Sequence, residues 1–301
     1  MNIALIVPTL NPKPRWQEWL DAYASQTLKP MRALVIDSSS NDDSVHLALD
    51  YGFEIVTIKK EEFGHGKTRQ YALSLMPEAD IVIYMTQDAI LHEPCALEKL
   101  VAPFLKDASI GAVYGRQLPH IGADLLEAHA RLFNYPPESQ IKSKEDMLRL
   151  GIKTAFCSNS FAAYRVSTLQ KIGGFPEHIV FGEDMYVAAK MILADFKIMY
   201  AADALCRHSH HYSLKEEFLR AFDIGTFHSR EPWLIESFGK VEGEGVRYAC
   251  SLLKEASKSS LSFFSVLLVI ILKVLGYRLG LCQSAFSKTI SFRSISKNKE
   301  N

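Results

Sequence analysis

Two places in the sequence hold carboxylates whose surroundings suit chemistry, and the first is Asp88. It follows Ile81 to Met85, an apolar run rich in β-branched residues that predicts a strand buried on both faces. In open α/β sheets ligands bind at the carboxyl ends of the strands, and a desolvated carboxylate there attracts a cation. Asp is also a frequent cap of turns and helices, so Asp88 alone leaves both roles open.

The second place is the pair Glu183-Asp184, which opens a predicted helix after Phe181 and Gly182. One positioned carboxylate can accept the proton of an attacking hydroxyl group. Acidic residues are also common in first helical turns, because they interact favourably with the helix dipole. The pair alone therefore does not distinguish a catalytic role from a structural one, and the rest of the sequence is needed.

Polar residues follow the other predicted strands as well. Pro8 to Asn11 come after an apolar run, and Asp37 to Ser40 come after another. His65 to Arg69 form a glycine-containing loop that leads into a helix. Singly, these residues fit helix caps or a solvated helix face. At one shared edge they would offer hydroxyls, amides and cations to a nucleotide. The candidate contacts are Pro8, Thr9, Asn11, Asp37, Ser39, His65, Gly66, Lys67, Arg69, Gln87 and Asp88.

The elements that must position these residues alternate between strand and helix, which predicts a doubly wound, mostly parallel α/β sheet. Trp16, Trp19, Leu20 and Tyr23 recur at helical spacing. Two later helices are expected to carry Val45, Leu47 and Leu49, and Tyr71, Leu73 and Leu75.

The second half departs from this alternation. Residues 135–144 predict a mobile polar loop, and Ile198 to Leu205 predict a strand. If that strand continued, His208 and His210 would face one way, as metal ligands would. A surface histidine cluster is the alternative.

The composition narrows the class of protein. Of 301 residues, 48% are hydrophobic, which suits one large domain or a domain with an appendage. Lys plus Arg and Asp plus Glu both number 34, so charge gives no reason to expect nucleic-acid binding. The five cysteines are scattered without a Cys-x-x-Cys spacing, which favours a reducing compartment over a disulfide framework or zinc cluster. The first residues predict a strand rather than a signal peptide.

The C-terminal part contains an apolar segment, Leu261 to Leu272, which Lys273 closes. Its 12 residues are few for a span, which needs about 20. We therefore expect a helix lying in the membrane plane, with a buried core helix or a dimer contact as the alternatives. The basic residues near the end, which would favour anionic lipid, are Lys288, Arg293, Lys297 and Lys299.

Several of these motifs, taken in order, resemble family-2 glycosyltransferases of the GT-A fold. They are Pro8 to Asn11, Asp37, the Asp88 turn, Gly173-Gly174-Phe175 and Glu183-Asp184. A narrower resemblance, to O-antigen rhamnosyltransferases, rests on the Phe-x-His-Gly-x-Thr-Arg loop at Phe63 to Arg69 and on Thr86-Gln87-Asp88-Ala89. Further similar blocks are Gly115 to His120, Cys157 to Arg165 and Arg207 to His210.

The resemblance implies a dTDP-β-L-rhamnose donor, galactosyl-diphospho-undecaprenol as acceptor and inversion at the anomeric carbon. It makes Asp184 the catalytic base, with Glu183 orienting its surroundings. Asp88 would hold Mg²⁺ or Mn²⁺. The usual family turn is Asp-x-Asp, whereas this chain has Gln87-Asp88-Ala89, so we expect His208 to share the metal.

The expected organisation is a GT-A catalytic domain over residues 1–220 and a helical, membrane-attached region over residues 221–301. We expect a peripheral protein on the cytoplasmic face of the inner membrane. Two alternatives remain at this stage. In the first, the same fold serves another donor, such as UDP-glucose or a different dTDP-sugar. The missing second carboxylate is also compatible with a catalytically silent scaffold of a polysaccharide assembly complex.

Overall fold

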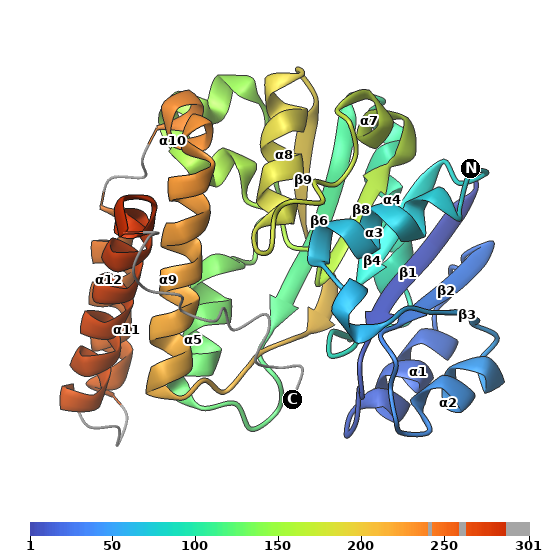
Figure 1. Cartoon of the computed structure of the whole chain (residues 1–301), viewed down its shortest axis with the longest axis horizontal. Helices are drawn as coiled ribbons and strands as arrows, with labels where there is room; N and C mark the ends of the chain where they lie inside the picture. Colours follow the sequence, from blue (N-terminus) through green and yellow to red (C-terminus); the bar gives the residue numbers. More distant parts are fainter. Residues whose placement is uncertain (240–242, 259–262, 287–301) are drawn as a thin grey trace. The chain divides into compact units, whose positions relative to one another are not determined.

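The structure is a computed structural model that describes residues 1–239, 243–258 and 263–286 (Figure 1). It consists of two compact units, each assembled from separate stretches of chain. The first unit contains Met1–Leu118, Tyr135–Asp146 and Thr154–His208. The second contains the described residues of Pro119–Asn134, Met147–Lys153 and Ser209–Asn301. The boundary expected at residue 220 falls inside helix α9 (Leu214–Arg230), and residues 119–134 group with the C-terminal helices.

The first unit is built on one sheet in the order β3-β2-β1-β4-β8-β6-β9-β5, with β7 beside β9. Its strands are β1 (Ile3–Thr9), β2 (Arg32–Asp37), β3 (Glu54–Thr57), β4 (Ile81–Met85), β5 (Ile90–Leu91), β6 (Ile110–Leu118), β7 (Gln140–Lys142), β8 (Phe161–Arg165) and β9 (Lys197–Arg207). Strands β1 to β4 pair in parallel, and β8 runs antiparallel between β4 and β6. The carboxyl ends of the first four strands therefore share one edge of the sheet.

Helices cover both faces of this sheet, as a doubly wound fold requires. On one face, α1 (Trp16–Ala24), α2 (Ser44–Asp50) and α4 (Ala96–Lys106) enclose the main hydrophobic core with alternate strand residues such as Ile83 and Met85. On the other face lie α3 (His65–Ser74) and α8 (Glu183–Leu193), beside Tyr84. The predicted α1 face is confirmed, because Trp16, Trp19, Leu20 and Tyr23 are all buried.

The predicted helix with Val45, Leu47 and Leu49 is present as α2, which buries Ala48 and leaves Leu49 51% exposed. Two other local predictions were wrong. The expected loop at His65 to Arg69 is the first turn of α3, and its one glycine, Gly66, serves close packing rather than a bend. The expected mobile loop at 135–144 contains β7, whose Lys142 is buried. Here pairing with β9 overrides the polar composition of the segment.

The second unit is helical in the part of the chain that the structure describes. Its α-helices are α5 (Leu125–Asn134), α6 (Met147–Leu150), α9, α10 (Pro232–Phe238), α11 (Glu244–Ala256) and α12 (Phe263–Phe286). Glycines let α12 approach α9 closely, since a Cβ at Gly276 would lie 2.4 Å from the Phe218 carbonyl oxygen. A Cβ at Gly280 would lie 2.2 Å from the Phe222 carbonyl oxygen. The two backbones therefore pack in direct contact.

Helix α12 is 24 residues long, twice the length of the apolar run that predicted it. It continues past Lys273 because the Lys273 ammonium pairs with the buried Glu217 of α9 at 2.6 Å. The stretch Phe263–Gln283 is long and apolar enough to cross a membrane. The predicted basic residues at Lys288, Arg293, Lys297 and Lys299 lie outside the described residues.

Candidate active site

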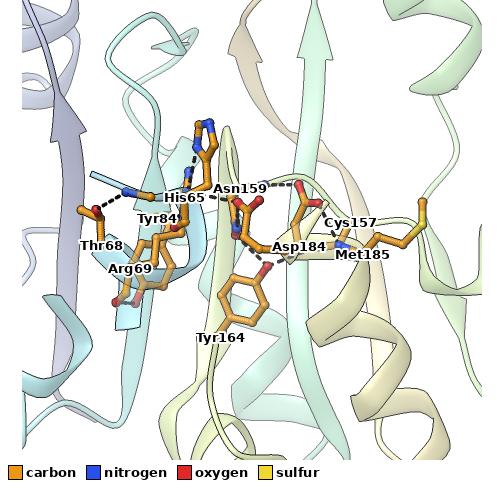
Figure 2. Close-up of polar contacts among 11 residues, drawn as sticks. His65, Thr68, Arg69, Tyr84, Cys157, Asn159, Tyr164, Asp184 and Met185 are labelled. Carbon is orange, nitrogen blue, oxygen red and sulfur yellow. Dashed lines mark hydrogen bonds and ion pairs between the residues drawn. The ribbon is translucent and has the colours of Figure 1, made fainter. Parts of the chain in front are cut away.

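A buried cluster of polar side chains joins α3, α8 and the segment before β8 (Figure 2). The Arg69 guanidinium contacts the Glu183 carboxylate at 3.0 Å, and these side chains are 3% and 7% exposed. The Asn159 amide donates to the same Glu183 oxygen at 2.9 Å. Tyr164 in turn donates its hydroxyl to Asn159 Oδ1 at 2.7 Å. Because each member holds the next, the start of α8 has one fixed geometry.

Asp184 lies beside this pair and keeps a more open position. Its carboxylate accepts the backbone N–H of Asn159 at 3.2 Å and that of Met185 at 2.8 Å. Burial, and after it the negative charge of Glu183, raise the pKa of Asp184 to about 7. A carboxylate with such a pKa can both accept and release a proton near neutral pH.

Glu183 has the opposite tendency, although it is the more buried of the two. Burial opposes ionisation, but Arg69, His65 and the Asn159 amide together lower the pKa of Glu183. Burial likewise lowers the pKa of His65, which favours the neutral imidazole. Adjacent carboxylates whose pKa values move apart are a mark of acid–base sites.

Close backbone contacts fix where α3 meets the turn before α8. A Cβ at Gly66 would lie 1.9 Å from the Pro176 carbonyl oxygen, so only glycine fits there. Gly174 has a positive φ of 76°, and the Gln70 side chain accepts the backbone N–H of Phe175 at 2.8 Å. The Gly-Gly-Phe turn thus brings Arg69 and Glu183, which are far apart in the sequence, into contact.

The ends of β1 and β2 form a second polar group at the sheet edge. Thr9 and Asp37 are register partners, and the Thr9 hydroxyl donates to Asp37 Oδ1 at 3.3 Å. Ser40 donates its N–H and its hydroxyl to the same carboxylate, at 2.9 and 2.5 Å. Asp37 is only 2% exposed, so it organises the loop that presents its neighbours.

Asn11 and Ser39 are the exposed members of this edge, and both have positive φ values, 43° and 65°. The Asn11 N–H donates to Ser40 Oγ at 2.9 Å, and its side chain accepts the N–H of Asn41 at 3.0 Å. Pro8, just before them, is partly buried. Strained backbone held by such contacts is frequent at ligand sites.

The turn after β4 connects to this edge through Gln87. Its side chain accepts the Leu10 N–H at 2.7 Å and donates to the Leu10 carbonyl at 3.1 Å. The turn also meets the segment before β8, because the Thr86 N–H donates to the Ser160 carbonyl at 3.3 Å. The next residue along that turn is Asp88, so the carboxylate lies between the two polar groups.

Asp88 and His208 form a pair suited to a divalent cation. Their Oδ1 and Nε2 atoms are 3.4 Å apart, with His208 7% exposed and Asp88 35% exposed. Oxygen and imidazole ligands at this separation suit Mg²⁺ or Mn²⁺. His208 follows the last residue of β9 and does not continue the strand, so the alternation expected for His208 and His210 does not apply.

The structure thus places the predicted residues of the first unit around one edge. Arg69 differs from the expected arrangement, because its guanidinium is turned towards Glu183 and is buried. Lys67, two residues earlier on α3, is exposed. Residues that the sequence interpretation did not assign are Gln117, Ser158, Asn159 and Ser40. The available signal was the polar block before β8, in which Asn159 donates its side-chain amide to Glu183 and its backbone N–H to Asp184.

Comparisons with known proteins agree with this geometry. Residues 4–173 match the family described as Glycosyl transferase family 2, which is more than half of the chain. The chain is 47% identical over 281 residues to the O-antigen chain rhamnosyltransferase WbaN of Salmonella anatum, covering 93% of this chain and 89% of that protein. It is equally similar, 47% over 282 residues, to the O-antigen chain rhamnosyltransferase RfbN of Salmonella typhimurium, covering 93% and 90%.

A solved structure shows the same fold. The mannosyltransferase PcManGT from Pyrobaculum calidifontis, in complex with GDP-Man and Mn²⁺, aligns with a TM-score of 0.59 at 18% identity. The alignment covers 99% of this chain and 86% of that one. The family match, the two relatives and the mixed α/β sheet lead to one conclusion: this chain is a glycosyltransferase and belongs to glycosyltransferase family 2.

Proposed function

We propose that this protein transfers L-rhamnose from dTDP-β-L-rhamnose to a polyprenyl-diphosphate-linked sugar, galactose by our expectation, during O-antigen assembly. The identity to two O-antigen chain rhamnosyltransferases over 93% of the chain supports the sugar and the pathway class. The observation that carries the chemistry is Asp184, a carboxylate with a pKa of about 7 beside a sheet edge lined with nucleotide-binding residue types.

Asp184 serves as the catalytic base. The acceptor hydroxyl attacks the anomeric carbon of the donor and loses its proton to the Asp184 carboxylate, while the bond from that carbon to the diphosphate oxygen breaks. A single direct displacement with one base inverts the anomeric configuration. Glu183 stays ionised through Arg69 and Asn159, and its charge keeps the pKa of Asp184 high enough for proton transfer at neutral pH.

The diphosphate leaving group needs positive charge. Asp88 and His208 would hold Mg²⁺ or Mn²⁺, which supplies Lewis-acid stabilisation of the leaving oxygens when bound. Lys67 is the exposed cation at the start of α3 and would contact phosphate directly. Arg69 does not contact the phosphates in this arrangement, because its guanidinium is buried against Glu183.

The nucleoside would lie along the ends of β1 and β2. Thr9 and Asp37 shape the loop, and the exposed Asn11 and Ser39 offer amide and hydroxyl groups to base and ribose. His65 and Gly66 line the start of α3 and Gln87 fixes the turn beside it. All of the predicted contact residues keep a role in this assignment, but the buried ones hold the loop and the turn in place and do not contact the nucleotide.

A lipid-linked acceptor requires the enzyme to work at a membrane, and α12 supplies the surface. Two of its polar residues face the other helices of the second unit, Lys273 towards Glu217 and Tyr277 towards His228. Its exposed side chains are mostly large and apolar: Phe263, Phe264, Leu267, Leu268, Ile271, Val274, Leu275 and Leu279. A helix with this reversed polarity suits lipid on its outer face.

We favour attachment in the membrane plane over a crossing. Helix α11 packs beside α12 and carries exposed charges such as Arg247 and Lys254, which a crossing would draw towards hydrocarbon. The proposed location is therefore peripheral, on the cytoplasmic face of the inner membrane.

The test is transfer itself. Purified protein is incubated with dTDP-β-L-rhamnose, a synthetic galactosyl-diphospho-lipid and Mg²⁺, and the lipid product is analysed by mass spectrometry for one added deoxyhexose. NMR of the product should show the anomeric configuration inverted relative to the donor. A parallel panel of UDP-glucose and other dTDP-sugars tests donor choice. Transfer from one of these donors and none from dTDP-rhamnose would overturn the proposed donor.

A further inference from the structure

The orientation of His208 is set by a buried glutamine. Gln117, on β6, is 1% exposed, and its side-chain oxygen lies 2.8 Å from His208 Nδ1. Its amide nitrogen donates to Ser158 Oγ at 2.9 Å, which turns the oxygen towards the imidazole. Nδ1 therefore carries the proton, and Nε2 is the ring atom that faces Asp88.

The backbone holds the same contact from the other side. The His208 N–H donates to the carbonyl of Leu118, the residue after Gln117, at 2.9 Å. Main chain and side chain of one strand end thus fix both the position and the ring orientation of His208. Contacts of this kind around metal-ligating histidines orient the ring and raise its basicity.

Ser158 links this arrangement to the carboxylate pair, because the next residue is Asn159. Asn159 donates its backbone N–H to Asp184 and its amide to Glu183. The segment itself is anchored by the buried Lys142, whose ammonium donates to the Phe156 carbonyl at 2.5 Å. A continuous chain of contacts therefore runs from Asp88 to Asp184 within the first unit.

We propose that Gln117, Ser158 and Asn159 are positioning residues that hold the metal-binding pair and the catalytic carboxylates in one geometry, with Gln117 fixing His208 as a ligand through Nε2. This inference rests on the proposed function, because it assumes that Asp88 and His208 bind a divalent cation. It goes further by assigning residues that contact neither donor nor acceptor.

Mn²⁺ binding in the presence of dTDP, measured by electron paramagnetic resonance of the free ion, tests the inference without turnover. Gln117→Leu removes the acceptor at nearly constant volume, and we expect Mn²⁺ affinity to fall about 10- to 100-fold. Gln117→Glu keeps an acceptor for Nδ1, since the Ser158 hydroxyl can turn to donate, so affinity should stay close to that of the parent.

Gln26→Leu is the matched control. Gln26 is also a buried glutamine, 2% exposed, and its side chain bonds to Ala22, Glu93 and Leu97 within the α1–α4 core. Its replacement costs comparable hydrogen bonds but should leave Mn²⁺ affinity unchanged. Circular dichroism confirms that each variant folds. If Gln117→Leu does not fold, Ser158→Ala takes its place, because it releases the glutamine amide by removing a single oxygen atom.

The outcomes distinguish a failure of the proposed metal site from a failure of the role assigned to Gln117 and Ser158. Parent protein that binds no Mn²⁺ with dTDP removes the metal pair from the proposed function, and this inference with it. Parent protein that binds Mn²⁺, together with folded Gln117→Leu or Ser158→Ala that binds it equally well, overturns the inference alone. Weaker binding in Gln117→Leu, rescued by Gln117→Glu and absent from Gln26→Leu, supports it.

Discussion

The two units of this protein each contain a buried ion pair, and the pairs serve different ends. Arg69 and Glu183 are almost fully buried beside the candidate active site, where burial and, after it, the Glu183 charge raise the pKa of Asp184. Lys273 and Glu217 lie between helices and are 30% and 10% exposed. There the pair lets a charged residue stay within a helix whose outer face is apolar. By our proposal, the first pair supports the chemistry of the first unit, and the second pair supports the placement of a surface helix in the second unit.

The largest expected effect comes from replacing the base. Asp184→Asn keeps the size of the side chain but removes its proton acceptor, so transfer should fall by about 10²- to 10⁴-fold. Binding of dTDP, measured by calorimetry, should be nearly unchanged, because nucleotide contacts lie at the strand ends. Parallel loss of binding and transfer in a folded variant would contradict the assignment of Asp184 as the base.

Removal of divalent cations should have the next largest effect. Excess chelator should suppress transfer, and added Mg²⁺ or Mn²⁺ should restore it, because the Asp88–His208 pair would lose the cation that neutralises the leaving diphosphate. Initial rates before and after metal addition give the measurement. Full activity in excess chelator would remove the metal role from Asp88.

Breaking each ion pair tests the comparison directly. Arg69→Met leaves Glu183 buried without its guanidinium, and the free energy of unfolding should drop by about 3 to 5 kcal/mol. Lys273→Met keeps the aliphatic stem in contact and removes a partly exposed charge, so the loss should be on the order of 1 kcal/mol. Guanidinium denaturation followed by circular dichroism gives both values. Equal losses would mean that the two pairs do not differ as described.

The pH dependence of activity and that of stability both test the raised pKa of Asp184. Asp184 must be unprotonated to act as a base, so kcat/KM should rise with pH through about 7 and then level off. Stability should show the opposite sign. Because folding raises the pKa of Asp184 from 3.8 to about 7, its contribution to stability is fully present below 3.8 and is lost as pH rises through 7. Asp184→Asn should remove this component from the stability curve; a curve identical to that of the parent would argue against the raised pKa.

The smallest expected effect concerns lipid binding by α12. Leu268→Glu with Leu275→Glu places charge on its exposed apolar face and should weaken co-sedimentation with anionic vesicles about tenfold. Leu105→Glu is the control, because Leu105 is an equally apolar side chain, 72% exposed on α4 of the first unit. If the parent protein ignores vesicles and the double variant changes from dimer to monomer in size-exclusion chromatography, the face is a dimer contact.

The sequence was sufficient for elements with a strong local pattern. The five apolar residues of β4 and the aromatic spacing of α1 predict these elements correctly. In both, the pattern of apolar residues within the segment itself indicates the element and its buried face. The polar edge followed from the shared ends of parallel strands. Local pattern failed at α3, where Gly66, which close packing against Pro176 requires, is typical of a loop in sequence.

Contacts between distant residues could not be read in the same way. In the sequence, Arg69 is a cation near the start of a predicted helix. Its contact with Glu183 in place of solvent becomes visible only in the folded structure. Lys142 sits in a polar stretch, yet its ammonium lies 4.8 Å from the centre of the Tyr114 ring. Both depend on which elements the sheet brings together, which no periodicity within a segment encodes.

The close seating of α12 has a practical consequence for protein production. A shortened chain ending at residue 258 would lose the apolar helix, and its composition alone would suggest higher solubility. It would also strip Lys273 from Glu217 and uncover the surface around Gly225 and Phe222 that α12 now covers. Deleting that helix would therefore remove one exposed apolar surface and expose another. Detergent or nanodiscs around the chain with α12 are the better route to a homogeneous sample.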